Sequence, residues 1–213
     1  MNRKTLNGLS NVTLYNGELM SLLKEYKSPQ MKIASIEKKE EIIRLKRGLY
    51  VVNGADYGKP VSRALCSNRI YCPSYLSLQW ALCYYTLIPE RTYELTAITT
   101  KRSRVFHNDL AKFSYYMVND NWFPIGIDIG IENGANFLVA SPEKALCDMI
   151  LVDPYLPSKS IIGLERYLEE DLRFDTDALA HFNIGILEAC AATGRKKNII
   201  NNLIKIVREH ELV

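Results

Sequence analysis

The side chains best suited to chemistry in this chain are cations spaced to meet phosphate groups. Lys32, Ser35 and Lys39 recur at i, i+3 and i+7, a spacing that brings them to one face of a helix. Lys46 and Arg47 fall at the turn between two short apolar runs. Lysine and arginine bind the phosphate oxygens of nucleic acids, and polar side chains on a helix read base edges in the major groove. The pattern therefore predicts DNA binding, with a solvated helix face and a polar turn as the alternative.

The residue patterns that catalysis or metal binding requires do not occur in the sequence. His107, His181 and His210 lie far apart, and there is no C-x-x-C pair, which argues against zinc. There is no G-x-S-x-G segment, no Cys–His neighbourhood and no P-loop. We expect no catalytic residue, no cofactor and no metal. The odd number of scattered cysteines suggests reduced thiols in a cytoplasm; they are Cys66, Cys72, Cys83, Cys147 and Cys190.

One enzymatic alternative stays open, a small metal-dependent nuclease formed by residues 90–150. Such a site needs converging carboxylates and a lysine, and the nearest candidates are Asp128, Glu132, Glu143 and Lys144. Glu143 and Lys144 are adjacent at the start of a predicted helix, where neighbouring side chains point about 100° apart. We therefore expect Glu143 to stabilise the helix N-terminus instead.

The charge of the chain is concentrated at one end. Its 213 residues carry a formal net charge of +3. Residues 1–70 contain 13 Lys and Arg against 6 Asp and Glu, a balance of +7, whereas residues 71–213 contain 14 against 18, a balance of −4. A basic segment joined to a mildly acidic remainder is expected where one part of a protein meets a polyanion.

The elements that would position the N-terminal cations follow from hydrophobic periodicity. A first helix is predicted over 16–27, with Asn16 as its N-cap. Ser28 and Pro29 open a second helix that ends near Lys39. The apolar side chains of this second helix are expected to face inward together; they are Ile33, Ala34 and Ile36.

A β-hairpin is predicted next, from the apolar runs 42–45 and 49–52 and the Gly-containing turn between them. Two helices and a hairpin are the order of a compact winged helix-turn-helix, which we assign to residues 1–60. We expect its second helix and hairpin to meet DNA through Ser28, Gln30, Lys32, Ser35, Lys39, Arg44, Lys46 and Arg47.

The remainder, residues 61–213, predicts a mixed domain with a small β-sheet and a helical C-terminal part, so the fold class is α+β. A soft boundary falls at 53–70, and Pro73 and Ser74 open a third helix that reaches Tyr85. Ser141 and Pro142 open a further helix with a buried face at Ala145, Leu146, Met149 and Ile150. Four β-prone runs predict the sheet, at 93–99, 113–118, 125–131 and 136–140. The last helices are expected at about 160–171, 176–191 and 196–210, with Asp175 or Thr176 as a cap and Gly194 as a stop.

The sequence also indicates where the protein resides. No apolar run approaches the ~18 residues of a membrane span, and no apolar region of a signal peptide follows the N-terminus. We expect a cytoplasmic protein without a membrane partner.

Three segments, in order, resemble the family of AbiEi-type antitoxins and their transcriptional-regulator relatives. Residues 42–51, IIRLKRGLYV, contain the R-L-x-R-G-x-Y segment of that family. Residues 73–82, PSYLSLQWAL, are similar to its P-x-Y-(V/I/L)-S-x-x-S-A-L helix, with Trp80 where serine is usual. Residues 140–148, ASPEKALCD, are similar to its A-x-P-E-K-A-L-x-D helix start. The resemblance spans 12–152 and leaves the helical tail without a motif.

This resemblance implies a bacterial regulator with an N-terminal winged helix and a C-terminal antitoxin-type domain. Such a protein represses its own operon by binding promoter repeats, and a dimer on repeated half-sites would fit them. It counters a nucleotidyltransferase toxin in an abortive-infection (phage-resistance) toxin–antitoxin system of type IV, without forming a stable complex with the toxin. Relatives of the family also act as plain regulators.

A third hypothesis is a protein-interaction module whose tail, 160–211, docks a partner. Arg195, Lys196 and Lys197 stand at a helix start, where cations oppose the helix dipole. A solvated turn is the simpler explanation for these three residues.

Overall fold

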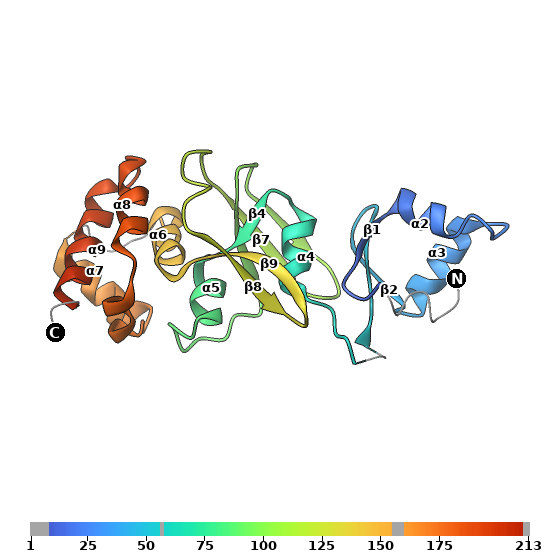
Figure 1. Cartoon of the computed structure of the whole chain (residues 1–213), viewed down its shortest axis with the longest axis horizontal. Helices are drawn as coiled ribbons and strands as arrows, with labels where there is room; N and C mark the ends of the chain where they lie inside the picture. Colours follow the sequence, from blue (N-terminus) through green and yellow to red (C-terminus); the bar gives the residue numbers. More distant parts are fainter. Residues whose placement is uncertain (1–8, 56–57, 155–159, 211–213) are drawn as a thin grey trace.

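A computed structural model describes residues 9–55, 58–154 and 160–210, and it shows a mixed α+β protein. The N-terminal elements, a central sheet and a group of C-terminal helices follow one another along the long axis (Figure 1). Expectations that fall on residues 1–8, on Asp56 and Tyr57 in the predicted boundary, or on Glu211 in the tail lie outside the described residues. No helix within the described ranges is long and apolar enough to cross a membrane.

The N-terminal unit consists of two helices against a three-stranded antiparallel sheet. Its elements are β1 (Thr13–Tyr15), α2 (Asn16–Leu22), α3 (Pro29–Lys38), β2 (Ile42–Lys46) and β3 (Leu49–Val52). The strand order is β1-β3-β2, with β3 paired to both neighbours. The predicted second helix and hairpin are therefore confirmed. Gly48 closes the hairpin with φ 77°, a backbone conformation that glycine adopts without strain.

The first helix differs from the prediction at both ends. Tyr15 is its N-cap rather than Asn16, and the backbone N–H of Tyr15 donates to the Glu18 carboxylate at 2.6 Å. The helix ends at Leu22 instead of Lys27, with Leu23 as C-cap, and Tyr26 is not part of it. Leu23 lies beyond the end of the helix but is fully buried in the core. The apolar spacing therefore identified a buried residue correctly but extended past the helix itself.

Helix α4 (Arg63–Ile70) occupies the segment predicted as a soft boundary. The Ser62 side chain caps it by accepting from the N–H of Leu65 at 3.0 Å. Glu132 adds a second cap, because its Oε2 accepts from the Ser62 hydroxyl at 2.7 Å and from the Ala64 N–H at 2.9 Å. The first turn of α4 is thus fixed by a residue from the far part of the chain.

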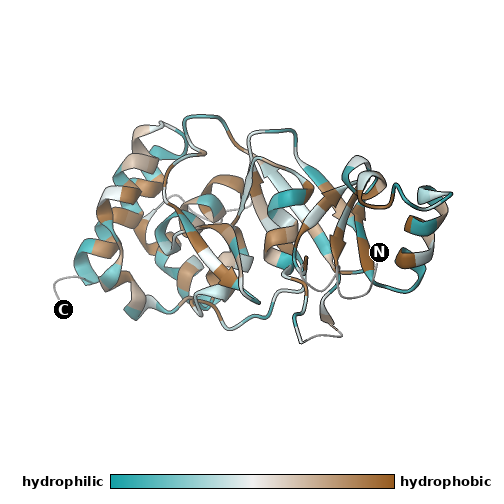
Figure 2. Ribbon diagram, turned by 45° about the vertical axis from the view of Figure 1, so that its right-hand side comes forward, coloured by the Kyte–Doolittle hydropathy of each residue, from teal (hydrophilic) through white to brown (hydrophobic). Residues whose placement is uncertain are grey.

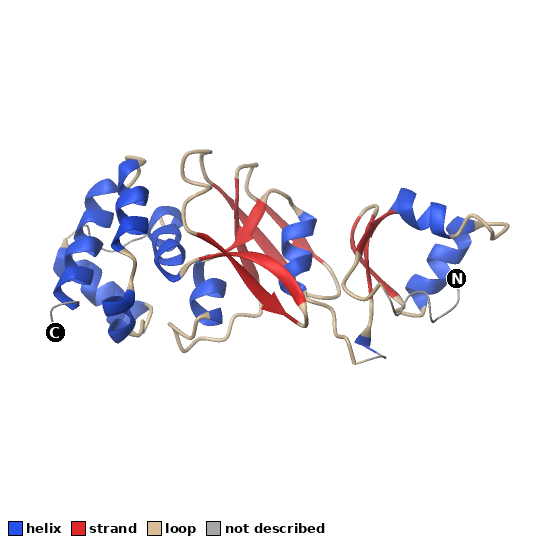
Figure 3. Ribbon diagram, viewed as in Figure 1, coloured by secondary structure: helices blue, strands red, loops and turns tan. Residues whose placement is uncertain are grey.

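The central sheet has six strands in the order β6-β7-β5-β4-β9-β8, and Figure 3 shows helices on its two sides. Its strands are β4 (Ser74–Leu76), β5 (Leu95–Thr99), β6 (Arg104–His107), β7 (Lys112–Met117), β8 (Ile127–Glu132) and β9 (Ala135–Ala140). The four predicted strands are present, and β6 is an addition.

The predicted helix over 73–85 is wrong in its first half. Residues Ser74–Leu76 form strand β4, paired with β5 on one side and β9 on the other. Helix α5 begins only at Leu78 and ends at Tyr84. A short apolar run fits a buried strand as well as a buried helix, so the sequence pattern alone did not separate the two.

The C-terminal part is helical. Helix α6 (Pro142–Val152) starts as predicted, with the Ser141 hydroxyl accepting from the Lys144 N–H at 3.3 Å. The expected long helices are interrupted: α7 (Ile161–Arg166) runs into a π-helix (Tyr167–Asp171), and a 3₁₀ segment (Thr176–His181) precedes α8 (Ile184–Ala192). Asp175 stands at the N-cap position of the 3₁₀ segment without a capping hydrogen bond from its side chain. Gly194 has φ 84° after α8, and α9 (Lys197–His210) completes the fold. Figure 2 shows hydrophobic and hydrophilic residues alternating along these helices, as expected when one face packs inward.

The β2–β3 hairpin has one face in each of two hydrophobic cores. Alternate side chains point to opposite faces of a strand, so neighbours separate between the two cores. One face packs against α2 and α3 through Ile42, Tyr50 and Val52. The other face joins the large core of the central sheet through Leu45, Leu49 and Val51. The sheet of the N-terminal unit is therefore also part of the main body.

Candidate nucleic-acid interface

Helix α3 presents one face to solvent because the opposite face is anchored in the N-terminal core. Ile33 and Ile36 are 5% and 2% exposed, in the same core as Leu19 and Leu23. Gln30 and Ser35 are exposed, as the sequence predicted. Ala34 was expected to face inward with the two isoleucines, but it is exposed. Its methyl group is small enough to lie in water at little cost.

The other predicted residues of α3 lie at its ends or along its side. Ser28 is the half-buried N-cap, and Lys39 is the exposed C-cap. Lys32 is half-buried, with its ammonium nitrogen 5.0 Å from the centre of the Tyr26 ring. A lysine ammonium over an aromatic face is attracted by the ring quadrupole. The exposed polar side chains of α3 therefore include Gln30, Ser35 and Lys38, with Lys39 at the C-cap and Lys32 beside them.

Arg44 does not present a free charge. Its guanidinium pairs with the Glu37 carboxylate at 2.7 Å and lies over the Tyr50 ring, 5.4 Å from its centre. This ion pair joins α3 to β2. Arg44 is nevertheless exposed, and its predicted contact with DNA stays a prediction.

Lys46 was expected at the hairpin tip and is instead the last residue of β2, turned toward the central body. Its ammonium donates to the Ile70 carbonyl at 2.6 Å, at the C-terminal end of α4. Partial burial, and then the charges of Lys101 and Arg104, lower the pKa of Lys46 below its ordinary value. Lys46 is therefore half-buried, because the hairpin packs on α4, and its contact with DNA stays a prediction. Arg47, the next residue, is exposed at the turn.

The neighbours of Lys46 reveal a cationic cluster that joins the hairpin to the loop between β5 and β6. Lys101 donates to the Cys72 carbonyl at 2.5 Å, two residues along the chain from the Ile70 carbonyl that holds Lys46. Both ammonium groups are thus held at the turn after α4. We call Lys46, Arg47, Lys101, Arg102 and Arg104 the cationic cluster.

In the described part of the chain, carboxylates do not pair with the cationic cluster. Among the described residues, none of its five members forms an ion pair with Asp or Glu. Arg47, Lys101, Arg102 and Arg104 are exposed. Like charges held together without a counter-charge repel one another, and an incoming anion relieves that repulsion. The cluster is therefore suited to a phosphate backbone.

Sequence reasoning missed the central-domain part of this cluster. The signal was the run Lys101-Arg102-Ser103-Arg104, which stands in a segment whose total balance is acidic. Summing the charges over residues 71–213 hid this basic run. The bond from Lys101 to the Cys72 carbonyl and the packing of the hairpin on α4 bring the start of this run beside Lys46.

Two of the acidic residues considered for a nuclease, Glu132 and Glu143, make structural hydrogen bonds. Glu132 caps α4, as described above. Glu143 is 6% exposed, and its Oε1 accepts from the Asn183 N–H at 2.8 Å, which ties α6 to the start of α8. Asp128 is exposed on β8. Within the described part of the chain, no three His, Cys, Asp or Glu side chains gather as a metal site would require.

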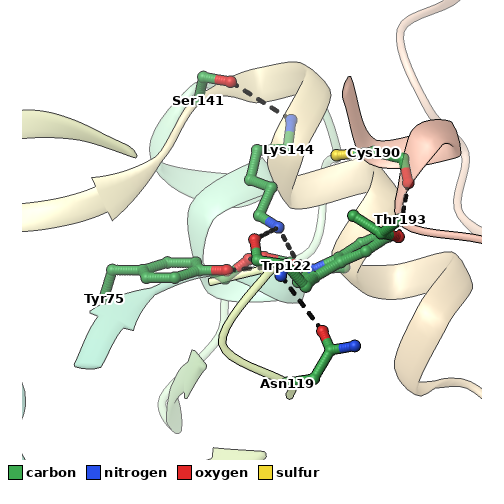
Figure 4. A network of polar contacts seen from close by, with 9 residues as sticks. Tyr75, Asn119, Trp122, Ser141, Lys144, Cys190 and Thr193 are labelled. Atoms are coloured by element: carbon green, nitrogen blue, oxygen red, sulfur yellow. Dashed lines mark hydrogen bonds and ion pairs between the residues drawn. The ribbon is translucent and has the colours of Figure 1, made fainter. Parts of the chain in front are cut away.

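The segment 140–148 builds a buried ion pair rather than an exposed site (Figure 4). Lys144 and Asp148 lie one turn apart on α6, 3.2 Å between Nζ and Oδ1, and both side chains are 0% exposed. The Lys144 ammonium also donates to the Trp122 carbonyl at 2.9 Å and lies 4.1 Å from the centre of the Trp122 ring. Asp148 accepts from the Trp122 indole at 2.5 Å and from the Ser77 hydroxyl at 2.6 Å. Lys144 and Asp148 therefore have their partners inside the protein and are not accessible to a ligand.

Comparison of the chain with protein-family models and with curated protein sequences gave no match.

Proposed function

We propose that this chain is a DNA-binding transcriptional regulator whose N-terminal unit acts as a winged helix. The order β1, α2, α3, β2, β3 supports this reading, with α3 as the recognition helix and the β2–β3 hairpin as the wing. The exposed side of α3 offers Gln30, Ser35 and Lys39 to base edges and phosphates.

The observation that carries the proposal is the uncompensated cationic cluster beside this unit. A protein that meets DNA gains most of its affinity from phosphate contacts that release counterions. Exposed cations for such contacts are Arg47 at the turn, Lys101 and Arg102 on the loop before β6, and Arg104 at the start of β6. The proposed DNA-contacting surface then consists of α3, the hairpin, and the part of the central domain that carries Lys101, Arg102 and Arg104.

The test is the salt dependence of binding to the DNA immediately upstream of the gene, measured by fluorescence anisotropy. Each phosphate contact contributes roughly 0.9 to the slope of log K against log salt concentration. Arg47→Gln/Arg102→Gln should reduce that slope by close to twice this amount and weaken binding to all sequences. Gln30→Ala should reduce the preference for the upstream sequence over unrelated DNA, by about 1–3 kcal/mol for a base contact.

Arg166→Gln/Lys205→Gln is the matched control, since it removes two exposed cations from the C-terminal helices. It should leave the slope unchanged. An Arg47→Gln/Arg102→Gln variant with the slope of the parent would contradict the proposed interface. Lys46 is excluded from the set because its substitution would also disturb packing on α4.

We further propose that the regulator is the antitoxin of a nucleotidyltransferase toxin. This part is supported by the three ordered segments that resemble AbiEi-type antitoxins, and by no other observation. A nucleotidyltransferase-like reading frame should lie beside the gene, and co-expression of this chain should restore growth to cells that produce that toxin. If cells that produce the toxin fail to grow even when this chain is co-expressed, the antitoxin role is contradicted, and the chain would be a transcriptional regulator without a toxin partner.

A further inference from the structure

A cavity of about 300 Å³ opens between α4 and the β8–β9 hairpin. Its apolar wall includes Leu65, Phe123, Ile129 and Leu138, and its polar lining includes Arg69 and Ser74. Small-molecule sites occupy about 300–1,000 Å³ and combine apolar walls with a few polar groups. The cavity lies at the lower end of this range, so it suits a small ligand.

The apolar wall is incompletely covered by the protein itself. Ile129 is 70% exposed and Leu138 is 42% exposed. The two residues are direct partners across β8 and β9, so their side chains lie on one face of the hairpin. Phe123, also in the wall, packs on Tyr75 with 5.1 Å between ring centres. A bound apolar body would remove this exposed hydrocarbon from water, at about 25 cal/mol for each Å² covered.

Two polar groups of the cavity have no partner among the described residues, whereas Asn68 in the lining is hydrogen-bonded to the backbone of Ser74 and Leu138. Ser74 is 2% exposed, and its buried hydroxyl has no hydrogen-bond partner among the described residues. Buried hydroxyl groups in proteins are normally paired, so an unpaired one calls for a ligand or a water molecule. Arg69 is exposed and forms no ion pair within the described chain.

Arg69 gives the cavity lining a positive charge, and within the described part of the chain no acidic residue lines the cavity. Cys72 also lines the cavity, and its carbonyl holds the ammonium of Lys101 at 2.5 Å. An arginine with a free guanidinium binds a carboxylate through two parallel hydrogen bonds. The cavity therefore favours an anionic head group joined to an apolar body.

We propose that this cavity binds a small carboxylate with an apolar body, its head group on Arg69 and its body against Ile129 and Leu138. The proposal is independent of DNA binding, because it concerns the uncovered face of β8 and β9 and can be tested without DNA.

The experiment is isothermal titration calorimetry of the full chain with octanoate and, separately, with uncharged octanamide. Octanoate should bind saturably with one ligand per chain. Arg69→Gln should weaken octanoate binding at least tenfold and change octanamide binding less than twofold. Ile129→Glu should weaken both, because it places a charge on the apolar wall.

The matched controls are Arg166→Gln and Ile162→Glu, which alter an exposed arginine and an isoleucine of 74% exposure on α7. Neither should change binding, and thermal unfolding of each variant verifies that it folds. The proposal is overturned by absence of saturable octanoate binding, or by an Arg69→Gln variant that weakens both ligands equally. It is also overturned if Ile129→Glu converts a dimer to a monomer in sedimentation, because a second copy of the chain would then cover the wall.

Discussion

Removal of the Asp148 carboxylate should destabilise the fold strongly, because it would leave charged and polar groups buried without partners. In Asp148→Ala, the Trp122 indole and the Ser77 hydroxyl lose acceptors at 2.5 Å and 2.6 Å, and Lys144 loses its counter-ion. Breaking a buried ion pair by removing one partner costs about 3–5 kcal/mol. Typical stabilities are only about 5–15 kcal/mol, so this loss is a large fraction of the total.

The assay is urea unfolding followed by circular dichroism, with Glu170→Ala as the matched control. Arg166 and Glu170 also form an i,i+4 pair, at 3.5 Å, but their side chains are 69% and 67% exposed. Exposed pairs contribute about 0–1 kcal/mol, so Glu170→Ala should change the free energy of unfolding by less than 1 kcal/mol.

A double variant separates the buried charge from lost packing. Lys144→Met/Asp148→Leu removes both charges and fills part of the space, so it should be more stable than Asp148→Ala. The reasoning is refuted if Asp148→Ala loses no more stability than Glu170→Ala, or if the double variant is the less stable of the two.

Two other predictions concern crowding and pH. Gly126→Ala should destabilise the protein more than Gly134→Ala. Both glycines have positive φ, 57° and 73°, so both substitutions strain the backbone. Only at Gly126 would the new methyl group also lie 2.9 Å from the Lys144 side chain. Equal losses in urea unfolding would contradict the crowding. Burial raises the pKa of Cys66 to about 12. The folded state therefore retains a proton on this thiol that the unfolded state releases near pH 9. The free energy of unfolding should fall as the pH rises from about 9 to 12. Cys66→Ala should reduce this fall by up to about 1.4 kcal/mol per pH unit, and substitution of the exposed Cys72 should not. If the free energy of unfolding depends on pH equally in both variants, the effect does not come from Cys66.

The elements with strong local signals were predictable from sequence. The Ser-Pro pairs at 28–29 and 141–142 marked the starts of α3 and α6, because serine caps a helix and proline suits its first turn. The hairpin followed from two apolar runs around Gly48. By contrast, β4 was read as helix, because its strand character depends on neighbours more than 20 residues away, on β5 and β9.

The candidate interface was predictable only in part, because side-chain roles depend on packing between distant elements. The exposure of Gln30, Ser35 and Arg47 agrees with the prediction. Lys46 is engaged by Ile70, 24 residues further along the chain, and no local pattern foretells that contact. The DNA-binding role of these residues stays a prediction until the binding experiments are made.

The hairpin with a face in each core has a consequence for dissecting the protein. A fragment that ends at residue 60 would place Leu45, Leu49 and Val51, each no more than 2% exposed in the full chain, in water. It would also lose the bond from Lys46 to Ile70 and the one from Asn108 to the Leu45 carbonyl, at 2.9 Å. Such a fragment is expected to aggregate. Studies of the N-terminal unit in isolation would need those three side chains replaced by polar ones.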